Sequence, residues 1–197
     1  TEPAALATQE ITPPAPGKAL LDEPLANENW YLPQFSGSTA KLQDGLLSLA
    51  LQNQSVTYEA SSRLTLPDNF YLQMQVDLAA CSNGDYYSLV FWKGSDLGTF
   101  VLDFNCQAQM RLRNLRDGGA RVLRDWTAVR KLAPQVPSSN LIGIWAIADR
   151  VDIFANGQFQ LEFDAAGNNG GGFGFSLSST GKGLTALSLS GLGIYEP

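Results

Sequence analysis

Residues 71–78, which read YLQMQVDL, alternate aromatic or polar side chains with aliphatic ones without a break. Because successive residues of a β-strand point to opposite faces, this pattern predicts a strand that buries one face, formed by Leu72, Met74, Val76 and Leu78. Three more stretches of the same kind follow at short intervals, over residues 86–92, 99–105 and 108–115. Together the four segments predict a four-stranded antiparallel meander.

The strand pattern continues toward the C-terminus. Residues 151–155 and 158–163 flank Asn156-Gly157, a pair that favours a type I′ hairpin because both central residues of that turn need a positive φ. Residues 140–148 are almost wholly apolar, which predicts a central strand covered on both sides. We expect eleven to thirteen strands and no helix, arranged as an all-β, two-sheet antiparallel jelly-roll sandwich.

The N-terminal segment differs in composition from the rest. The first 20 residues lack apolar periodicity and contain four prolines, Pro3, Pro13, Pro14 and Pro16. We therefore expect residues 1–19 to be a flexible, Pro-rich linker and residues 20–197 to be one sandwich domain. The linker would follow a removed signal or a membrane anchor, or join a further domain. The sequence contains no run of about 20 apolar residues, so we expect no transmembrane segment in it.

Charge and composition exclude several functions. The formal net charge is −6, which argues against a nucleic-acid partner, since such proteins neutralise phosphates with Lys and Arg. Seven of the thirteen basic residues fall between Arg111 and Lys131, either as a solvated strand face and loop or as an anion site. The sequence contains no histidine, which excludes Ser-His-Asp catalysis and His-ligated zinc.

Two cysteines, Cys81 and Cys106, are too few for a four-thiolate metal site. Cys81 follows one predicted strand and Cys106 ends the next strand but one, and in an antiparallel meander these positions lie at the same end of the sheet. This placement favours a disulfide in an oxidising compartment. Two reduced, buried cysteines are the alternative.

Several segments carry a resemblance to a known family. They are Leu21-Asp22-Glu23 with Trp30, the strand over residues 70–78, the YYSLVFW strand at 86–92, the hairpin at 150–157, the GFGF strand at 172–175 and the GLGIY strand at 191–195. Together they resemble the concanavalin A-like lectin/glucanase superfamily, in its branch with laminin-G-like and 3-keto-disaccharide-hydrolase-like domains. The resemblance covers residues 20–197 and concerns the fold rather than any activity.

In that superfamily the concave face of one sheet commonly holds a sugar. Alternation along the meander places one set of side chains on its outer face, and we predict these as ligand-binding residues: Tyr86, Trp92, Asp103, Asn105, Arg111 and Arg113. Aromatic rings would stack on a pyranose while the polar groups hydrogen-bond its hydroxyls. The alternative is an ordinary solvated face on which Asp103 only pairs with Arg111 or Arg113.

Catalytic and metal-binding motifs are weak. Glycosidases of this fold generally carry a Glu-x-Asp-x-x-Glu strand, which this sequence lacks. The nearest carboxylate grouping is Asp149, Asp152, Glu162 and Asp164, in which Asp152 would meet Glu162 and Asp164 across the hairpin. No cofactor is expected. A structural calcium site at Asp164, Asn168 and Asn169 is an alternative to an ordinary flexible loop.

These observations predict a non-catalytic carbohydrate- or surface-glycan-binding module of an extracytoplasmic protein, tethered to the membrane through the N-terminal linker. Two alternatives remain: a glycan-active hydrolase of the 3-keto-disaccharide type, or a structural or protein-interaction domain of a larger surface protein.

Overall fold

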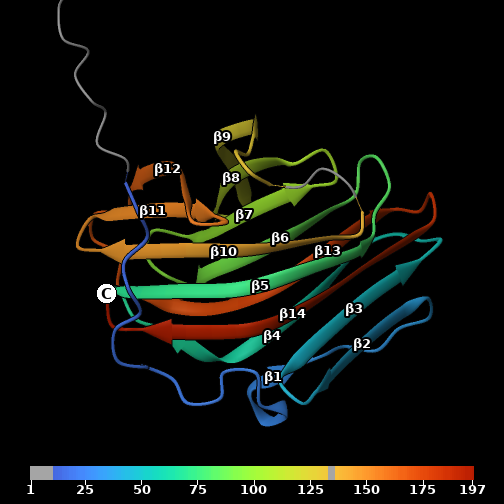
Figure 1. The fold of residues 1–197 in the computed structure, drawn as a ribbon, viewed down its shortest axis with the longest axis horizontal. Coiled ribbons are helices and arrows are strands. Elements are labelled where there is room, and N and C mark those ends of the chain that lie inside the picture. The colour runs from blue at the N-terminus through green and yellow to red at the C-terminus, as the bar shows by residue number, and fades with distance from the viewer. Residues whose placement is uncertain (1–10, 133–135) are drawn as a thin grey trace, which may run out of the picture.

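Two antiparallel seven-stranded sheets lie face to face in the computed structural model, which describes residues 11–132 and 136–197 (Figure 1). The first sheet has the order β1 (Trp30–Tyr31), β4 (Ser55–Leu66), β13 (Gly171–Thr180), β6 (Tyr86–Lys93), β7 (Thr99–Asn105), β8 (Gln109–Arg116), β9 (Gly119–Ala128). The second has the order β12 (Gln158–Asp164), β11 (Arg150–Ala155), β10 (Ser138–Ile147), β5 (Phe70–Ala80), β14 (Leu184–Tyr195), β3 (Leu46–Gln52), β2 (Ser38–Gln43). This arrangement confirms the predicted two-sheet antiparallel jelly-roll sandwich.

The number of strands exceeds the prediction of eleven to thirteen. Fourteen strands fall within the described residues, and the extra one is β1, which is only two residues long. The single helical element in the same residues is a 3₁₀ turn, Asn27–Asn29.

The core forms where the inner faces of the two sheets meet. In β5, Leu72, Met74, Val76 and Leu78 are all buried, as the alternation predicted. They belong to the same buried cluster as Leu89 of β6 and Leu102 of β7, which come from the first sheet and are 0% exposed. Burial of these two facing rows removes apolar surface from water and is the main stabilising contribution to the sandwich.

The predicted meander is wrong in its first strand. β5 belongs to the second sheet, where it pairs with β10 and β14, and residues 81–85 then cross to the first sheet. The four consecutive strands that do form a meander are β6, β7, β8 and β9. Alternation shows which face of a strand is buried but does not identify the neighbouring strand, which is why the crossover was missed.

The crossover end of the sandwich carries the predicted disulfide. Cys81 follows β5 and Cys106 follows β7, and their Cα atoms are 5.9 Å apart in a Cys81–Cys106 disulfide. Beside it, the buried carboxylate of Asp85 accepts hydrogen bonds from the backbone N–H of Ser82, the N–H and hydroxyl of Thr180, and the hydroxyl of Thr185. The disulfide connects the end of β5 with the end of β7 in the first sheet, and Asp85 connects the same region with the end of β13 in the first sheet and the start of β14 in the second.

Reduction of the disulfide should destabilise the fold measurably. The two cysteines are 25 residues apart, and in the chain-entropy model a closed loop of this length stabilises by about 3–4 kcal/mol. Equilibrium urea unfolding with and without reductant should show this difference, and a Cys81→Ala/Cys106→Ala variant should reproduce it without reductant. Equal stability of the oxidised and reduced protein would contradict the prediction.

The predicted hairpin is confirmed. Asn156 and Gly157 have φ values of 49° and 74°, and Ala155 pairs with Gln158 directly before and after them. Both φ values lie in the left-handed region, where Gly meets no Cβ clash and Asn is tolerated better than most residues.

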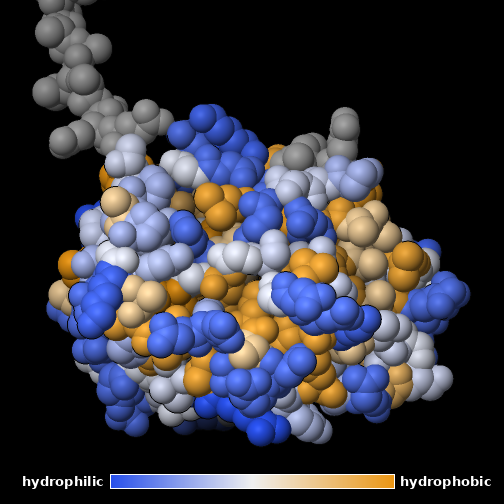
Figure 2. Space-filling model, turned by 60° about the horizontal axis from the view of Figure 1, so that its bottom comes forward, coloured by the Kyte–Doolittle hydropathy of each residue, from blue (hydrophilic) through white to orange (hydrophobic). Residues whose placement is uncertain are grey.

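The predicted central strand is covered on one side only. β10 lies between β11 and β5, and its inward Ile142 and Ile144 are buried. On its outer face Leu141 and Ile147 are 39% and 40% exposed. A surface view that brings the β1 and β2 side of Figure 1 forward also shows hydrophobic residues reaching solvent between hydrophilic ones (Figure 2). Apolar composition therefore overstated how fully β10 is enclosed.

The segment before the first strand contacts the end of the chain. The backbone N–H of Leu20 donates to the carbonyl of Ile194, and that of Glu196 donates to the carbonyl of Lys18. Ala19 forms an isolated bridge with Tyr195. The linker boundary at residue 19 stays a prediction, and residues 1–10 lie outside the described part of the chain. Within the described part, no helix has the length and hydrophobicity needed to cross a membrane.

Candidate functional site

A hollow of about 270 Å³ lies on the outer face of the first sheet and extends across β4, β13, β6, β7 and β8. Val90 and Val101 contribute apolar surface to its lining and are nearly buried, although they point away from the core. Its polar lining includes Thr57, Glu59, Tyr86, Lys93, Arg113 and Ser178. It thus combines a small apolar surface with several hydrogen-bonding groups.

The strand register explains why these side chains gather. Residues directly opposite each other in neighbouring strands point to the same face. One such row crosses five strands, in the order Glu59, Ser176, Ser88, Asp103, Arg111. The adjacent row contains Thr57, Ser178, Tyr86 and Asn105. Polar side chains at alternate positions of β4, β13, β6, β7 and β8 therefore lie side by side on the outer face.

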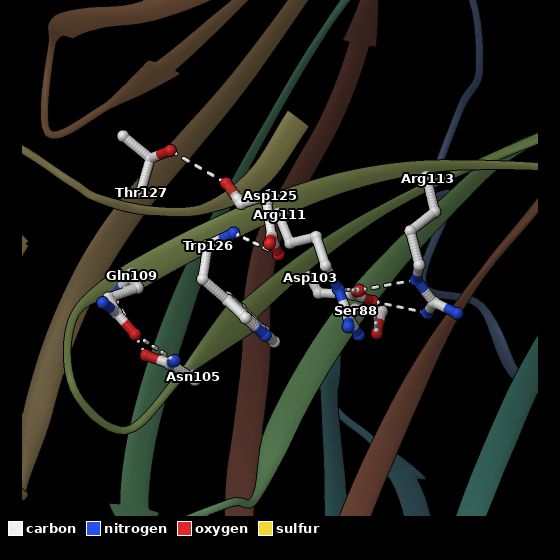
Figure 3. A network of polar contacts seen from close by, with 9 residues as sticks. All are labelled: Ser88, Asp103, Asn105, Gln109, Arg111, Arg113, Asp125, Trp126 and Thr127. Atoms are coloured by element: carbon white, nitrogen blue, oxygen red, sulfur yellow. Dashed lines mark hydrogen bonds and ion pairs between the residues drawn. The ribbon is translucent and has the colours of Figure 1, made fainter. Parts of the chain in front are cut away.

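Asp103 is the centre of a polar network on this face (Figure 3). Its carboxylate accepts hydrogen bonds from the Ser88 hydroxyl at 2.7 Å and from Nε of Arg111 at 2.8 Å. Arg113 donates to both carboxylate oxygens, through Nε at 2.7 Å and Nη2 at 2.8 Å. Asp103 is 0% exposed, whereas each guanidinium side chain is 20% exposed. The buried carboxylate thus holds two cations at the surface in fixed orientations.

Arg111 is also held by two aromatic rings. Its guanidinium carbon lies 4.5 Å from the ring centroid of Trp126 and 5.6 Å from that of Tyr86. The two rings contact each other edge to face, with centroids 6.1 Å apart. Cation–π attraction and the ion pair with Asp103 act together on one side chain, so Arg111 has little freedom to move.

The charges in the hollow shift two pKa values. Partial burial raises the pKa of Glu59, but the hydrogen bonds from Lys93 and Ser61 and the charge of Lys93 outweigh this and leave it below its ordinary value. Hydrogen bonding to Asp103 raises the pKa of Arg113, against the lowering effect of its burial. Both groups are therefore held in their charged forms.

Trp92 was predicted to lie on this face, and that placement is wrong. It is 1% exposed, its indole N–H donates to the carbonyl of Pro67 at 2.8 Å, and its ring meets that of Phe70 edge to face. The cause is an irregularity at the end of β6. Trp92 has a φ of 52°, and the pairing with β13 shifts register beside it. A bulge of this kind interrupts the alternation, so that Phe91 and Trp92 are both in the core.

The other five predicted residues lie close together, but not all of them reach the hollow. Tyr86 and Arg113 line it, and Asp103 and Arg111 adjoin it through the network described above. Asn105 is engaged in the β7–β8 turn, where it accepts the N–H of Gln107 and donates to Gln109. The pairing expected under the alternative of an ordinary solvated face is observed, with Asp103 bound to both arginines, and ligand binding by these residues stays a prediction.

Sequence reasoning missed part of this face. The turn sequence Asp117-Gly118-Gly119 predicts a strand over residues 120–124, which stops short of Trp126, whereas β9 continues to Ala128. The available signal for Trp126 was the presence of an aromatic residue within the basic stretch of residues 111–131. Thr57, Glu59 and Ser178 were missed because the alternation alone does not show that β13 lies beside β6 and β4 beside β13.

The predicted carboxylate grouping is only partly assembled, and it lies elsewhere. Asp152 and Glu162 are opposite each other across the β11–β12 hairpin, but Arg150 ion-pairs with both of them, at 2.8 and 3.2 Å. Hydrogen bonding to Asp152 raises the pKa of Arg150. Asp164 instead accepts the N–H of Ala166.

Two of the three predicted calcium ligands, Asp164 and Asn169, make other contacts, whereas the buried side-chain amide of Asn168 has no hydrogen-bond partner among the described residues. Asp164 caps the N–H of Ala166, and the side-chain amide of Asn169 donates to Asp96 at 3.0 Å. Across residues 11–132 and 136–197, no three His, Cys, Asp or Glu side chains are grouped closely enough to hold a metal ion.

A larger hollow of about 580 Å³ lies between the β8–β9 hairpin and residues 164–166. Arg116 and Arg121 line one part of it and Asp164 another, and none of the predicted binding residues is present. We favour the smaller hollow as the candidate site because the buried Asp103 fixes Arg113 in its lining, which reduces the entropy lost on binding.

The chain is similar to known proteins in structure but not in sequence. No family model matches the sequence, and the curated proteins include no match. A carbohydrate-binding module, CBM66, from Bacillus subtilis aligns with a TM-score of 0.63 and 11% identity, covering 85% of this chain and 96% of that one. A protein of unknown function with a galectin-like fold, from Bacillus subtilis, aligns with a TM-score of 0.70 and 14% identity, over 94% of this chain and 98% of that one.

A β-1,3-1,4-glucanase (lichenase) from a mouse hindgut metagenome also aligns, with a TM-score of 0.61 and 12% identity, over 80% of this chain and 83% of that one. Identities this low establish a common fold and nothing about activity. The chain has the sandwich fold of the concanavalin A-like lectins and glucanases.

Proposed function

We propose that this chain is a non-catalytic carbohydrate- or surface-glycan-binding module, and that the hollow on the outer face of the first sheet is its binding site. The observation that carries the proposal is the arrangement of Tyr86 and Arg113 around one small hollow, with Arg113 fixed by the buried Asp103.

The lining suits a sugar in three respects. Tyr86 offers an aromatic edge or face to the C–H groups of a pyranose, while Thr57, Ser178 and Arg113 offer hydrogen bonds to hydroxyls. The volume of the hollow, about 270 Å³, is just below the roughly 300–1,000 Å³ typical of ligand pockets. A hollow of this size suits a small ligand of one or two sugar rings. The solved structures with this fold include a carbohydrate-binding module and a glucanase, which also supports the proposal.

The carboxylates of the site favour binding over hydrolysis. A glycosidase needs a carboxylic acid with a raised pKa to protonate the leaving group. Glu59 has a lowered pKa because Lys93 and Ser61 stabilise its anion, despite partial burial. Asp103 is enclosed by Ser88 and two guanidinium groups, so its oxygens are already occupied.

We further propose an extracytoplasmic location. The Cys81–Cys106 disulfide supports it, since such bonds persist mainly in oxidising compartments. Membrane tethering through residues 1–19, and membership of the laminin-G-like or 3-keto-disaccharide-hydrolase-like branch, stay predictions.

Replacing Tyr86 by alanine should weaken glycan binding about two- to tenfold, because aromatic stacking contributes about 0.5–1.5 kcal/mol. Binding is first located on a glycan array containing neutral and acidic members, and affinity for the best member is then measured by isothermal titration calorimetry. The Tyr86→Phe variant retains the ring and should bind nearly as well as the parent.

Tyr31→Ala is the matched control, because Tyr31 is an exposed tyrosine of the same sheet but lies on β1, outside the hollow. It should leave affinity unchanged. Equal losses of affinity in Tyr86→Ala and Tyr31→Ala would refute the proposed site. Absence of binding to any glycan would refute the proposed function.

A further inference from the structure

We propose that the glycan bound by this chain is acidic, and that a carboxylate or sulfate group of the sugar binds to the paired guanidinium groups of Arg111 and Arg113. This inference rests on the proposed function and adds the chemical class of the ligand.

The charges around Asp103 do not balance. One buried carboxylate serves two arginines, so the cluster carries a net charge of +1. Asp125 lies on the neighbouring strand β9, but it is exposed, its carboxylate accepts the N–H of Trp126, and no ion pair joins it to either arginine within the described residues. The remaining ion pair in the hollow, between Glu59 and Lys93, is neutral. One positive charge of the arginine pair is therefore not balanced by a carboxylate on this face among the described residues.

The unbalanced charge has hydrogen-bonding groups available. Arg111 uses only Nε toward Asp103, and Arg113 uses Nε and Nη2. Among the residues that the structure describes, both Nη atoms of Arg111 and Nη1 of Arg113 make no hydrogen bond, and each side chain is 20% exposed. Guanidinium groups bind planar or tetrahedral oxyanions through such paired donors.

The two arginines are also held in place before any ligand binds. Arg111 is held by the rings of Tyr86 and Trp126 and by Asp103. Arg113 is held by a two-point contact with the same carboxylate (Figure 3). Arg113 lines the hollow directly, beside Tyr86. A sugar ring in the hollow can therefore place an anionic substituent against the pair without ordering either side chain.

The wider charge distribution agrees with this assignment. Residues 111–131 contain seven Arg or Lys and two Asp, although the whole chain has a net charge of −6. An acidic polysaccharide would be repelled by most of the surface and attracted to this region, which favours binding in one orientation.

The first test uses matched glycans with the unmodified protein. Oligogalacturonides are compared with their methyl esters, and a sulfated galactan with the same galactan after desulfation. We expect the charged member of at least one pair to bind about 10- to 100-fold more tightly, as a charge-assisted hydrogen bond would give. The preferred pair distinguishes carboxylate from sulfate. Raising the salt concentration should reduce the preference.

The second test separates this site from general attraction to a basic surface. Arg111→Gln should abolish the preference for the charged glycan, because Asp103 then neutralises Arg113 alone. Arg121→Gln removes the same charge from an exposed position of β9 and should retain the preference. Circular dichroism and thermal melting check that both variants fold. Polyaspartate, an acidic polymer without sugar, serves as a further control for general attraction to positive charge. If Arg111→Gln does not fold, the comparison of matched glycans and of polyaspartate with the unmodified protein tests the inference.

The outcomes distinguish the two proposals. Equal binding of neutral and charged glycans would overturn the acidic-ligand inference and leave the proposed function standing. Equal losses in Arg111→Gln and Arg121→Gln, or equally tight binding of polyaspartate, would overturn the inference as well. If neither neutral nor acidic glycans bind, the proposed function itself fails.

Discussion

Replacing Trp92 by alanine should reduce the free energy of unfolding by about 3–5 kcal/mol, the usual cost of truncating a buried aromatic residue. Trp92 is 1% exposed, hydrogen-bonds to Pro67 and packs against Phe70 and Phe100. The substitution would leave a large cavity beside the end of β6 and would leave the carbonyl of Pro67 without its indole partner. Equilibrium urea denaturation of the purified variant measures the loss.

Trp126→Ala is the matched control and should reduce the free energy of unfolding by only about 1 kcal/mol, because its ring is partly exposed and its described partners are Arg111 and Tyr86 at the surface. The same variant should weaken glycan binding, since Arg111 loses one of its two aromatic contacts. Comparable destabilisation by the two tryptophan substitutions would contradict the placement of Trp92 in the core and Trp126 on the outer face.

Removing the Asp103 carboxylate should also destabilise the fold strongly. We expect Asp103→Ala to lower the free energy of unfolding by about 3 kcal/mol, at the lower end of the range for breaking a buried ion pair. Two guanidinium groups would lose their shared partner, and Ser88 would lose its acceptor. The lower end applies because both arginine side chains are 20% exposed and can turn toward water.

Asp125→Ala provides the comparison, because it removes an equal charge from an exposed position on the neighbouring strand. Its effect should stay within about 0.5 kcal/mol. Thermal melting of both variants at the same pH and salt concentration gives the difference. An effect of Asp103→Ala as small as that of Asp125→Ala would mean that the network does not stabilise the sheet.

The sequence predicted local structure better than strand order. The range of β7 was predicted as residues 99–105, as observed, and the Asn156-Gly157 turn was correct, because alternation and turn chemistry are local properties. The sheet to which β5 belongs depends on the path of residues 81–85 and on pairing with β10 and β14, which are distant in sequence. Local patterns carry no information on such pairing, so the meander was extended by one strand too many.

The candidate site shows the same division. Tyr86, Asp103, Arg111 and Arg113 were placed together because strict alternation holds through β7 and most of β6 and β8. Trp92 was misplaced because one residue with positive φ reverses the alternation, and this conformation has no strong signature when the residue is not Gly or Asn. β9 was predicted to be too short because its side chains are mostly exposed and polar, which obscures the strand pattern.

The buried Asp85 has a consequence for the behaviour of the sandwich in acid. Burial raises the pKa of this carboxyl, but hydrogen bonds from Thr185, Thr180 and Ser82 outweigh that effect and leave the pKa below its ordinary value. A carboxylate of this kind stabilises the fold above its unfolded-state pKa, and the contribution disappears only as the pH falls through the lower, folded-state pKa. The hydrogen bonds that Asp85 accepts from Ser82, from Thr180 at the end of β13 and from Thr185 in β14 should therefore persist through mild acidification. In stronger acid they would be lost, while the adjacent Cys81–Cys106 bond, which does not titrate, would still hold β5 to the end of β7.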